Sequence, residues 1–370
     1  MLIRFSWSWS LATVMLLVAS AEAGTLSLTN FKPFDPDPAS GVGSAKPVGR
    51  DDQGDIVLQV QNLSGDYQVG FFNPAANIYS LVPVTDGGPN VAVGAFSGGA
   101  VGRIGSAPAK WSTDGSVSFL SLPPNATSAW LTASSAIGFT GVAIESGNAR
   151  PVFWNATGQP TYLDGSGNAN AISGDGLIVA GYSAGRATVW NTQSGVSRFL
   201  LPTGGYSNAL AISSNGGLAA GQVLDNGQFH PIILNLNSDT FQILANQGHM
   251  TYGKILSIDS GWLFGATNDT AGNLAATIWT PTGEVFPLNE FPGLDIHWHL
   301  LSAISGEVGA DGNTVTLIVD ATNEVGQERA AELTLSYTLP EPSSFVLGAM
   351  GAVVLFIARQ RSRRRLKMPQ

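Results

Sequence analysis

The sequence predicts an all-β fold made of repeated units of short strands, and three observations support this. Apolar residues alternate with polar ones or form runs of three to five, a pattern typical of strands and not of amphipathic helices. These runs end at Asp-Gly, Asn-Gly and Gly-Gly pairs, which favour hairpin turns, as at Asp175-Gly176 and Asn226-Gly227. The same order of residues returns about every 40 positions. A period of that length built from strands is typical of β-propeller blades.

Each repeat begins with Ala-Ile-Ser or a related triplet, continues with small residues and a glycine, reaches a tryptophan and ends near a leucine. The small Ala and Gly residues suit a crowded inner strand close to a propeller axis. The anchoring isoleucines are Ile137, Ile172, Ile212, Ile258 and Ile304, with spacings of 35, 40, 46 and 46 residues. Six units can be counted from residue 90 onward, and residues 55–84 supply a further blade or the strand that closes the ring. We therefore expect a six- or seven-bladed propeller over residues 55–339.

The repeats are similar to the HAF-type extracellular repeats of bacterial exported proteins, over roughly residues 90–335. One tryptophan stands at the same place in four of the units. These residues either fill the space between adjacent blades or form an exposed row that holds sugar rings. Their recurrence at one position per unit favours the packing role. The four are Trp111, Trp154, Trp190 and Trp279.

The N-terminal residues 1–23 have the three parts of a secretory signal peptide. Arg4 supplies a positive charge, residues 7–18 are apolar, and Ala21-Glu22-Ala23 forms an A-x-A site with cleavage expected before Gly24. An uncut membrane anchor is the alternative, although the apolar run is short for a span. Residues 24–54 are rich in Pro and Asp, and we expect an extended arm or linker there.

The C-terminal residues 340–370 combine three features. Pro340-Glu341-Pro342 comes first, and a run of fourteen apolar and small residues follows at 345–358. The run predicts a single short transmembrane helix, although a relaxed helix uses ~20 residues to cross a bilayer. A cluster of basic residues follows the run. Because Lys and Arg flanking a membrane segment stay on its cytoplasmic side, we expect residues 24–339 to lie outside the cytoplasm. The arginines of that cluster are Arg359, Arg361, Arg363, Arg364 and Arg365.

These three features resemble the PEP-CTERM protein-sorting domain, and the resemblance covers about the last 30 residues. It implies that Pro340, Glu341 and Pro342 are recognised by an exosortase-like processing enzyme. It also implies that the apolar helix and its arginines hold the chain transiently in the inner membrane of a Gram-negative bacterium. The expected destination is the cell surface or the exopolysaccharide matrix. If the tail is retained, the chain is instead a permanently anchored envelope protein.

Charge excludes one class of partner. Residues 24–339 contain ten Lys and Arg against 24 Asp and Glu, a formal charge of −14. Such a surface repels the phosphates of nucleic acids, so we expect no nucleic-acid binding. A polysaccharide is compatible with it, although an anionic one would need a local basic patch or bridging cations. The absence of Cys excludes a disulfide scaffold, a thiolate metal site and a cysteine nucleophile.

No catalytic, metal or cofactor motif is present in the sequence. His297-Trp298-His299 would place two imidazoles on one face of a strand, a spacing that suits two metal ligands, but no third ligand can be named. We therefore interpret this pair as polar loop-edge residues, and His230 and His249 lie far from it in sequence. The Asp-Gly turns lack the pattern of a calcium loop and are expected to be turn formers. The favoured hypothesis is a non-enzymatic binding or structural scaffold, and the alternative is a glycan-active hydrolase or lyase on the same propeller.

Overall fold

The computed structural model describes residues 25–34, 36, 41–83, 88–201, 205–244, 252–268 and 271–338. The chain divides into two compact units, and the first, Ser27–Ser336, contains the repeats. The second unit joins Met1–Leu26 to Tyr337–Gln370, and only residues 25–26 and 337–338 of it are described. The predicted signal peptide with Ala21, Ala23 and Gly24, the Pro-Glu-Pro motif, the apolar segment and the arginine cluster therefore lie outside the described residues.

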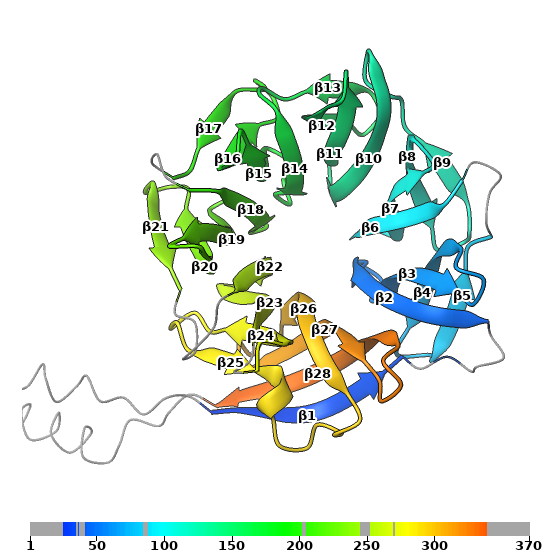
Figure 1. Ribbon diagram of the computed structural model, residues 1–370, viewed down its shortest axis with the longest axis vertical. Coiled ribbons are helices and arrows are strands. Elements are labelled where there is room, and N and C mark those ends of the chain that lie inside the picture. Colours follow the sequence, from blue (N-terminus) through cyan, green and yellow to red (C-terminus); the bar gives the residue numbers. More distant parts are fainter. Residues whose placement is uncertain are drawn as a thin grey trace, which may run out of the picture. The chain divides into compact units, whose positions relative to one another are not determined.

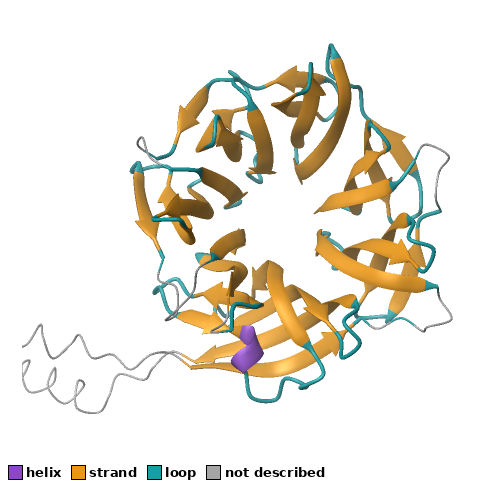
Figure 2. Ribbon diagram, in the orientation of Figure 1, coloured by secondary structure: helices purple, strands orange, loops and turns teal. Residues whose placement is uncertain are grey.

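Seven four-stranded sheets surround a central opening in the unit Ser27–Ser336 (Figures 1 and 2). The prediction of an all-β propeller is confirmed, with seven blades. Blade 1 contains β2 (Val42–Arg50), β3 (Ile56–Asn62), β4 (Tyr67–Asn73) and β5 (Ile78–Leu81). Blade 2 contains β6 (Asn90–Phe96), β7 (Gly99–Ile104), β8 (Ala107–Ser112) and β9 (Val117–Phe119). Blade 3 contains β10 (Ala126–Ser135), β11 (Gly138–Glu145), β12 (Asn148–Asn155) and β13 (Pro160–Tyr162).

The remaining blades follow the same order, apart from the last. Blade 4 contains β14 (Gly167–Ile172), β15 (Ile178–Ser183), β16 (Arg186–Asn191) and β17 (Ser197–Phe199). Blade 5 contains β18 (Ser207–Ile212), β19 (Leu218–Asp225), β20 (Gln228–Asn235) and β21 (Thr240–Ile243). Blade 6 contains β22 (Gly253–Asp259), β23 (Trp262–Asn268), β24 (Leu274–Trp279) and β25 (Val285–Pro287). Blade 7 contains β26 (His299–Val308), β27 (Thr314–Thr322), β28 (Glu328–Thr338) and β1 (Thr25–Pro33).

Strand β1 closes the ring, because it pairs with β28 at the outer edge of blade 7. The Ser27 hydroxyl donates to the carbonyl of Ser336 at 3.4 Å, and the Thr29 hydroxyl donates to that of Thr334 at 2.9 Å. The structure thus differs from the extended arm or linker expected over residues 24–54, which supply β1 and the inner strand β2. Pro47 lies within β2, where the free edge of an inner strand and an adjacent β-bulge accommodate a residue that has no N–H.

A β-bulge occurs at the same place in all seven inner strands. Its unpaired residue is Val48, Val93, Thr132, Asn170, Leu210, Leu256 and Ile304 in blades 1 to 7. The true anchor of the repeat is this bulge. Ile172, Ile212 and Ile258 each lie two residues after it, whereas Ile137 lies in the turn after β10 and Ile304 is itself the bulged residue. Two of the five predicted anchors were therefore wrong.

The repeated glycines of blades 2 to 6 lie on the second strand, opposite the bulge, and not on the inner strand as the sequence suggested. Gly181 pairs with Ala169, which directly precedes the bulged Asn170. A Cβ atom on Gly181 would lie 2.0 Å from the backbone oxygen of Asn168, so only glycine fits. The equivalent glycines, with Cβ-to-oxygen distances between 1.9 and 2.1 Å, are Gly102, Gly141, Gly221 and Gly265.

The core lies between adjacent blades and contains the four repeated tryptophans, each with 0% of its surface exposed. Their predicted packing role is confirmed, and they do not form an exposed row. The Trp190 indole N–H donates to the carbonyl of Asp164 at 2.7 Å, and that of Trp154 donates to Ser121 at 2.8 Å. Within the described ranges the only helical segment is η2 (Leu288–Glu290), and no helix there could span a membrane.

Candidate binding site at the channel mouth

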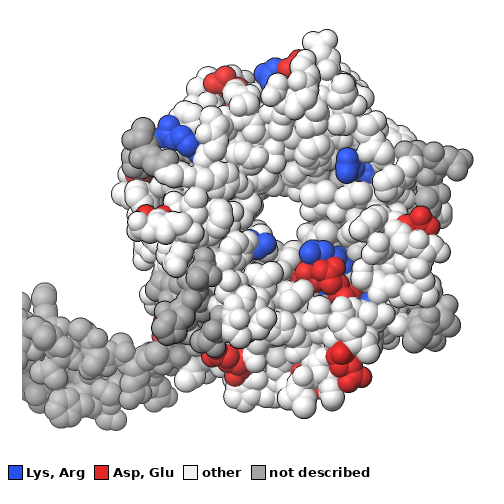
Figure 3. All heavy atoms as spheres, in the orientation of Figure 1, with Lys and Arg blue, Asp and Glu red and all other residues white. Residues whose placement is uncertain are grey.

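The central channel is narrowed by one bulged residue from each blade. These seven side chains line a cavity of about 450 Å³ and are apolar except for Thr132 and Asn170. Asn170 donates to the Asn208 side chain at 2.7 Å and to the carbonyl of Ala209 at 2.8 Å, so its amide group is bound within the wall. We call the end of the channel at which the inner strands begin the proximal mouth. Figure 3 shows basic and acidic atoms side by side at the rim of the central opening.

An ion-pair cluster at the proximal mouth joins the first and last blades. Lys46 on β2 lies two residues before the bulge of blade 1, and its Nζ is 3.2 Å from Asp320 Oδ2 and 3.9 Å from Glu328 Oε1. The Asp320 side chain is only 3% exposed, whereas the Lys46 side chain is 48% exposed. Burial raises the pKa of Asp320 to about 6, because desolvation outweighs the attraction of Lys46. For Lys46, burial acts to lower the pKa, but the two carboxylates outweigh it and raise the pKa.

Lys254 is the second lysine of this mouth and occupies on β22 the position that Lys46 has on β2, two residues before the bulge. Its side chain is partly buried. Among the described residues, no carboxylate lies within 4.0 Å of its Nζ. Burial lowers the pKa of Lys254, and the positive charge of Lys46 lowers it further. The Asp320 carboxylate attracts Lys254 from beyond this distance and opposes the lowering, so the mouth has an ammonium group with no ion-pair partner in direct contact among the described residues.

Two acceptor atoms near this mouth also lack partners. Asp320 Oδ1 and Gln222 Oε1 are buried and have no hydrogen-bond partner within the described part of the chain. Gln222 on β19 pairs with Asn208, which lies two residues before the bulge of blade 5. Gln222 thus lies at the same level of the channel as the two lysines. A buried acceptor without a donor costs about 1–3 kcal/mol, so donors from a bound molecule or from water would stabilise this arrangement.

Asp320 makes the stability of the propeller dependent on pH. Its pKa of about 6 in the folded protein exceeds its ordinary value of 3.8, so between these values the folded state holds a proton that the unfolded state has released. The stabilisation from this group is full below pH 3.8 and is lost as pH rises through about 6. Relative to Asp320→Asn, we expect the parent protein to lose roughly 3 kcal/mol of unfolding free energy between pH 4 and pH 7. Urea unfolding at several pH values measures this, and parallel curves for both proteins would contradict it.

The histidine pair is not arranged as a strand motif. His297 lies in a turn, with its Nδ1 3.1 Å from Glu324 Oε2 on the surface, and only His299 belongs to β26. The His299 Nε2 is 2.9 Å from the carbonyl oxygen of Leu274. The two imidazoles therefore do not share one strand face, in agreement with the interpretation of this pair as polar loop-edge residues. No group of three His, Asp or Glu residues that could hold a metal occurs among the described residues, and His249 lies outside them.

The Asp-Gly turns bind their own backbone. Asp175 accepts hydrogen bonds from the Ser173 hydroxyl at 2.6 Å and from the Leu177 N–H at 3.0 Å, and these bonds lower its pKa. Asp311 accepts from the Asn313 and Thr314 N–H groups at 3.0 and 2.9 Å. The prediction that these aspartates form turns is confirmed.

Sequence reasoning missed Lys46, Lys254, Gln222 and Asp320. They belong to four different blades. Each stands in a strand between small or apolar neighbours, which is unusual for the charged side chains of Lys46, Lys254 and Asp320 and notable for the polar Gln222. That signal could have marked them individually, but it could not have placed them at one mouth.

Comparison with solved structures supports the fold. An oligogalacturonate lyase from Vibrio parahaemolyticus is 9% identical with a TM-score of 0.54, over 84% of this chain and 98% of that one. A puromycin-hydrolyzing peptidase from Mycobacterium tuberculosis is 14% identical with a TM-score of 0.53, over 82% of this chain and 54% of that one. TolB from Acinetobacter baumannii is 13% identical with a TM-score of 0.44, over 74% and 79%. No family model matches the chain, and no curated protein matches it either. The two matches with TM-scores above 0.5 support the propeller fold, and at these identities they show nothing about activity.

Proposed function

We propose that this chain is an exported, non-enzymatic propeller that binds a carboxylated glycan at the proximal mouth of its channel. The observation that carries the proposal is that one level of the channel holds the Lys254 ammonium, with no carboxylate within 4.0 Å among the described residues, and two buried acceptors, Gln222 Oε1 and Asp320 Oδ1, that have no donor there. A uronate carboxylate can accept from Lys254, and a small movement of the Gln222 and Asp320 side chains would bring their buried acceptors within reach of sugar hydroxyls.

The charge at the proximal mouth favours a carboxylated glycan, although residues 24–339 are acidic overall. Lys46, Lys254, Asp320 and Glu328 have charges that sum to zero, whereas residues 24–339 together have a formal charge of −14. A carboxylate is therefore repelled less at this mouth than over the rest of the surface. Lys254, which is outside the ion pairs of this cluster, would supply the local basic group that an anionic polysaccharide needs.

The predicted targeting segments supply the cellular setting of the proposal. An N-terminal signal peptide and a tail that resembles PEP-CTERM would export the protein and deliver it, through an exosortase-like enzyme, to the cell surface or exopolysaccharide matrix. There a rigid propeller would serve as a binding scaffold. The intact mass of protein from the native host tests this part, because a species from Gly24 to about Pro340 supports processing and a retained arginine cluster contradicts it.

The binding proposal is tested by titrating the full chain with tetragalacturonate in a calorimeter. We expect Lys254→Met to weaken binding about tenfold, because a charge-assisted hydrogen bond contributes ~1.5–3 kcal/mol. Gln222→Leu should weaken binding less, since it removes a neutral acceptor. The matched control is Lys32→Met on β1, away from the channel, which should bind like the parent. Equal affinity in the parent and in Lys254→Met would refute the proposal.

A second candidate function is a glycan-active hydrolase or lyase. The observation in its favour is that the same mouth holds a lysine with a lowered pKa and an aspartate with a raised pKa, the kind of pair that acid–base chemistry uses. Chromatography of tetragalacturonate after long incubation distinguishes the two functions. Intact ligand supports the scaffold, and shortened products, with or without the unsaturated end of a lyase product, support the enzyme.

A further inference from the structure

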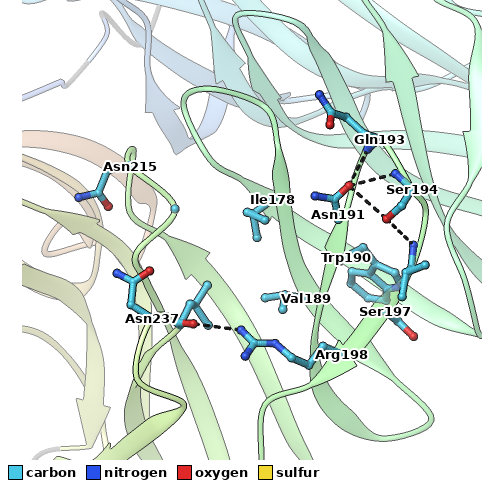
Figure 4. A pocket seen from close by; sticks show the side chains of 13 residues that line it. Ile178, Val189, Trp190, Asn191, Gln193, Ser194, Ser197, Arg198, Asn215 and Asn237 are labelled. Carbon is cyan, nitrogen blue, oxygen red and sulfur yellow. Dashed lines mark hydrogen bonds between the residues drawn. The ribbon is translucent and has the colours of Figure 1, made fainter.

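A second concave site lies between blades 4 and 5, at the other end of their inner strands. It is a groove of about 720 Å³. Its walls are the β16–β17 turn of blade 4 and two turns of blade 5, between β18 and β19 and between β20 and β21. Figure 4 shows Asn215 and Asn237 on one side of the groove, Asn191 and Gln193 on the other, and Ile178 and Val189 between them.

The floor of the groove is apolar. Ile178 and Val189 form it, and the buried Trp190 lies in the wall beside them. Val196 extends this surface toward solvent and is 63% exposed. Aliphatic side chains at the base of an open groove can contact the C–H faces of a sugar ring, which are the apolar part of a carbohydrate.

Two amide groups at the rim are held in fixed orientations by the turns. Asn191 Oδ1 accepts the N–H groups of Gln193 and Ser194, both at 3.0 Å. Asn215 Oδ1 accepts the Ser213 hydroxyl at 2.8 Å and the Gly217 N–H at 2.9 Å. The turns thus occupy the oxygen of each side chain, and within the part of the chain that the structure describes neither Nδ2 group has a hydrogen-bond partner. Each Nδ2 is a pre-oriented donor.

The groove presents little net charge. Arg198 pairs with Asp239 and donates to the carbonyl of Leu236 at 3.2 Å, so its guanidinium is already bound. The other polar side chains of the groove, Gln193, Ser194, Ser197 and Asn237, are uncharged. Fixed amide donors above an aliphatic floor suit a ligand with many neutral hydroxyl groups.

We propose that this groove binds a neutral glycan, and that it acts independently of the proximal mouth. The two sites lie at opposite ends of the inner strands, since Asn208 stands at the mouth end of β18 and Asn215 follows the other end of that strand. One propeller could then hold two glycan chains of different charge at once.

The test replaces Asn191 and Asn215 by the residue types that occupy the equivalent positions in other blades of the same chain. Asn191 follows Trp190 as Thr280 follows Trp279, and Thr280 also accepts a turn N–H. Asn215 corresponds to Asp175 in the same turn of blade 4. The double variant N191T/N215D therefore keeps an oxygen that can accept a turn N–H at each position and removes both amide NH₂ donors. With the full chain and cellohexaose as probe, we expect its affinity to fall at least tenfold.

Two controls separate this proposal from the proposed function. Asn155→Thr changes the equivalent turn of blade 3, where Asn155 Oδ1 accepts the Gln159 N–H at 3.0 Å, and should not alter cellohexaose binding. Lys254→Met should also leave cellohexaose binding unchanged, and N191T/N215D should leave tetragalacturonate binding unchanged. The groove proposal fails if cellohexaose does not bind or if N191T/N215D binds it like the parent. If Lys254→Met abolishes cellohexaose binding, the molecule has only the mouth site and the groove proposal is overturned.

Discussion

The Gly181→Ala variant is expected to lose about 3 kcal/mol of unfolding free energy, the upper end of the usual cost of overpacking. The added methyl group would lie 2.0 Å from the backbone oxygen of Asn168 and 3.0 Å from the Cα of Ala169. Both are atoms of the neighbouring inner strand. Relief would require β14 and β15 to separate next to the bulge, which would break ladder hydrogen bonds.

Urea unfolding followed by tryptophan fluorescence measures this loss. The matched control is Gly217→Ala, where the nearest atoms to the new Cβ are side-chain atoms of Asn215 and Asn237 at 3.2 Å, a distance that a shift of about a few tenths of an ångström would relieve. We expect the control to change stability by less than about 1 kcal/mol. If Gly181→Ala were as stable as the control, the close approach of β14 to position 181 would not be the reason that this position requires glycine.

The Trp190→Ala variant is expected to lose about 3–5 kcal/mol, the usual cost of removing a buried aromatic side chain. Trp190 is 0% exposed, and the substitution also leaves the carbonyl of Asp164 without its indole donor. Thermal unfolding gives the size of the loss.

Blade 5 has a leucine at the position equivalent to Trp190, and this suggests Trp190→Leu as the variant to compare with Trp190→Ala. Leu234 pairs with Ala219 as Trp190 pairs with Val179, so leucine already occupies the equivalent place. Trp190→Leu should therefore be more stable than Trp190→Ala by about 1–3 kcal/mol, because it fills part of the cavity. Equal stability of the two variants would show that the surroundings of Trp190 collapse onto the smaller side chain.

The repeating part of the fold could be predicted from sequence because each blade uses the same residues for the same contacts. Trp111, Trp154, Trp190 and Trp279 recur at one position since each fills the same space between blades. The closing strand could not be predicted in this way. β1 occurs once and has no equivalent to compare, and the prolines that follow it suggested a linker.

The residues of the proximal mouth could not be predicted from the sequence either, and the reason is different. Lys46, Lys254 and Asp320 are distant in sequence and come together only because seven blades close into a ring. Their positions relative to the bulge decide which side chains reach the channel, and the bulge has no fixed residue type. Two of the five anchoring isoleucines were misassigned for the same cause, because the repeat conserves a backbone irregularity and not one side chain.

The pairing of β1 with β28 also sets the order of folding events. Thr29 and Thr334 are 305 residues apart in the chain, so this contact is among the most non-local that the molecule makes. Bringing together the ends of a flexible segment of that length costs ~5 kcal/mol of chain entropy, and such contacts form late and slowly. Blades 1 to 6 are each built from consecutive strands and can form while synthesis continues. The seventh blade needs both β1 and β28, so the ring cannot close until the last strand of the body has been synthesised.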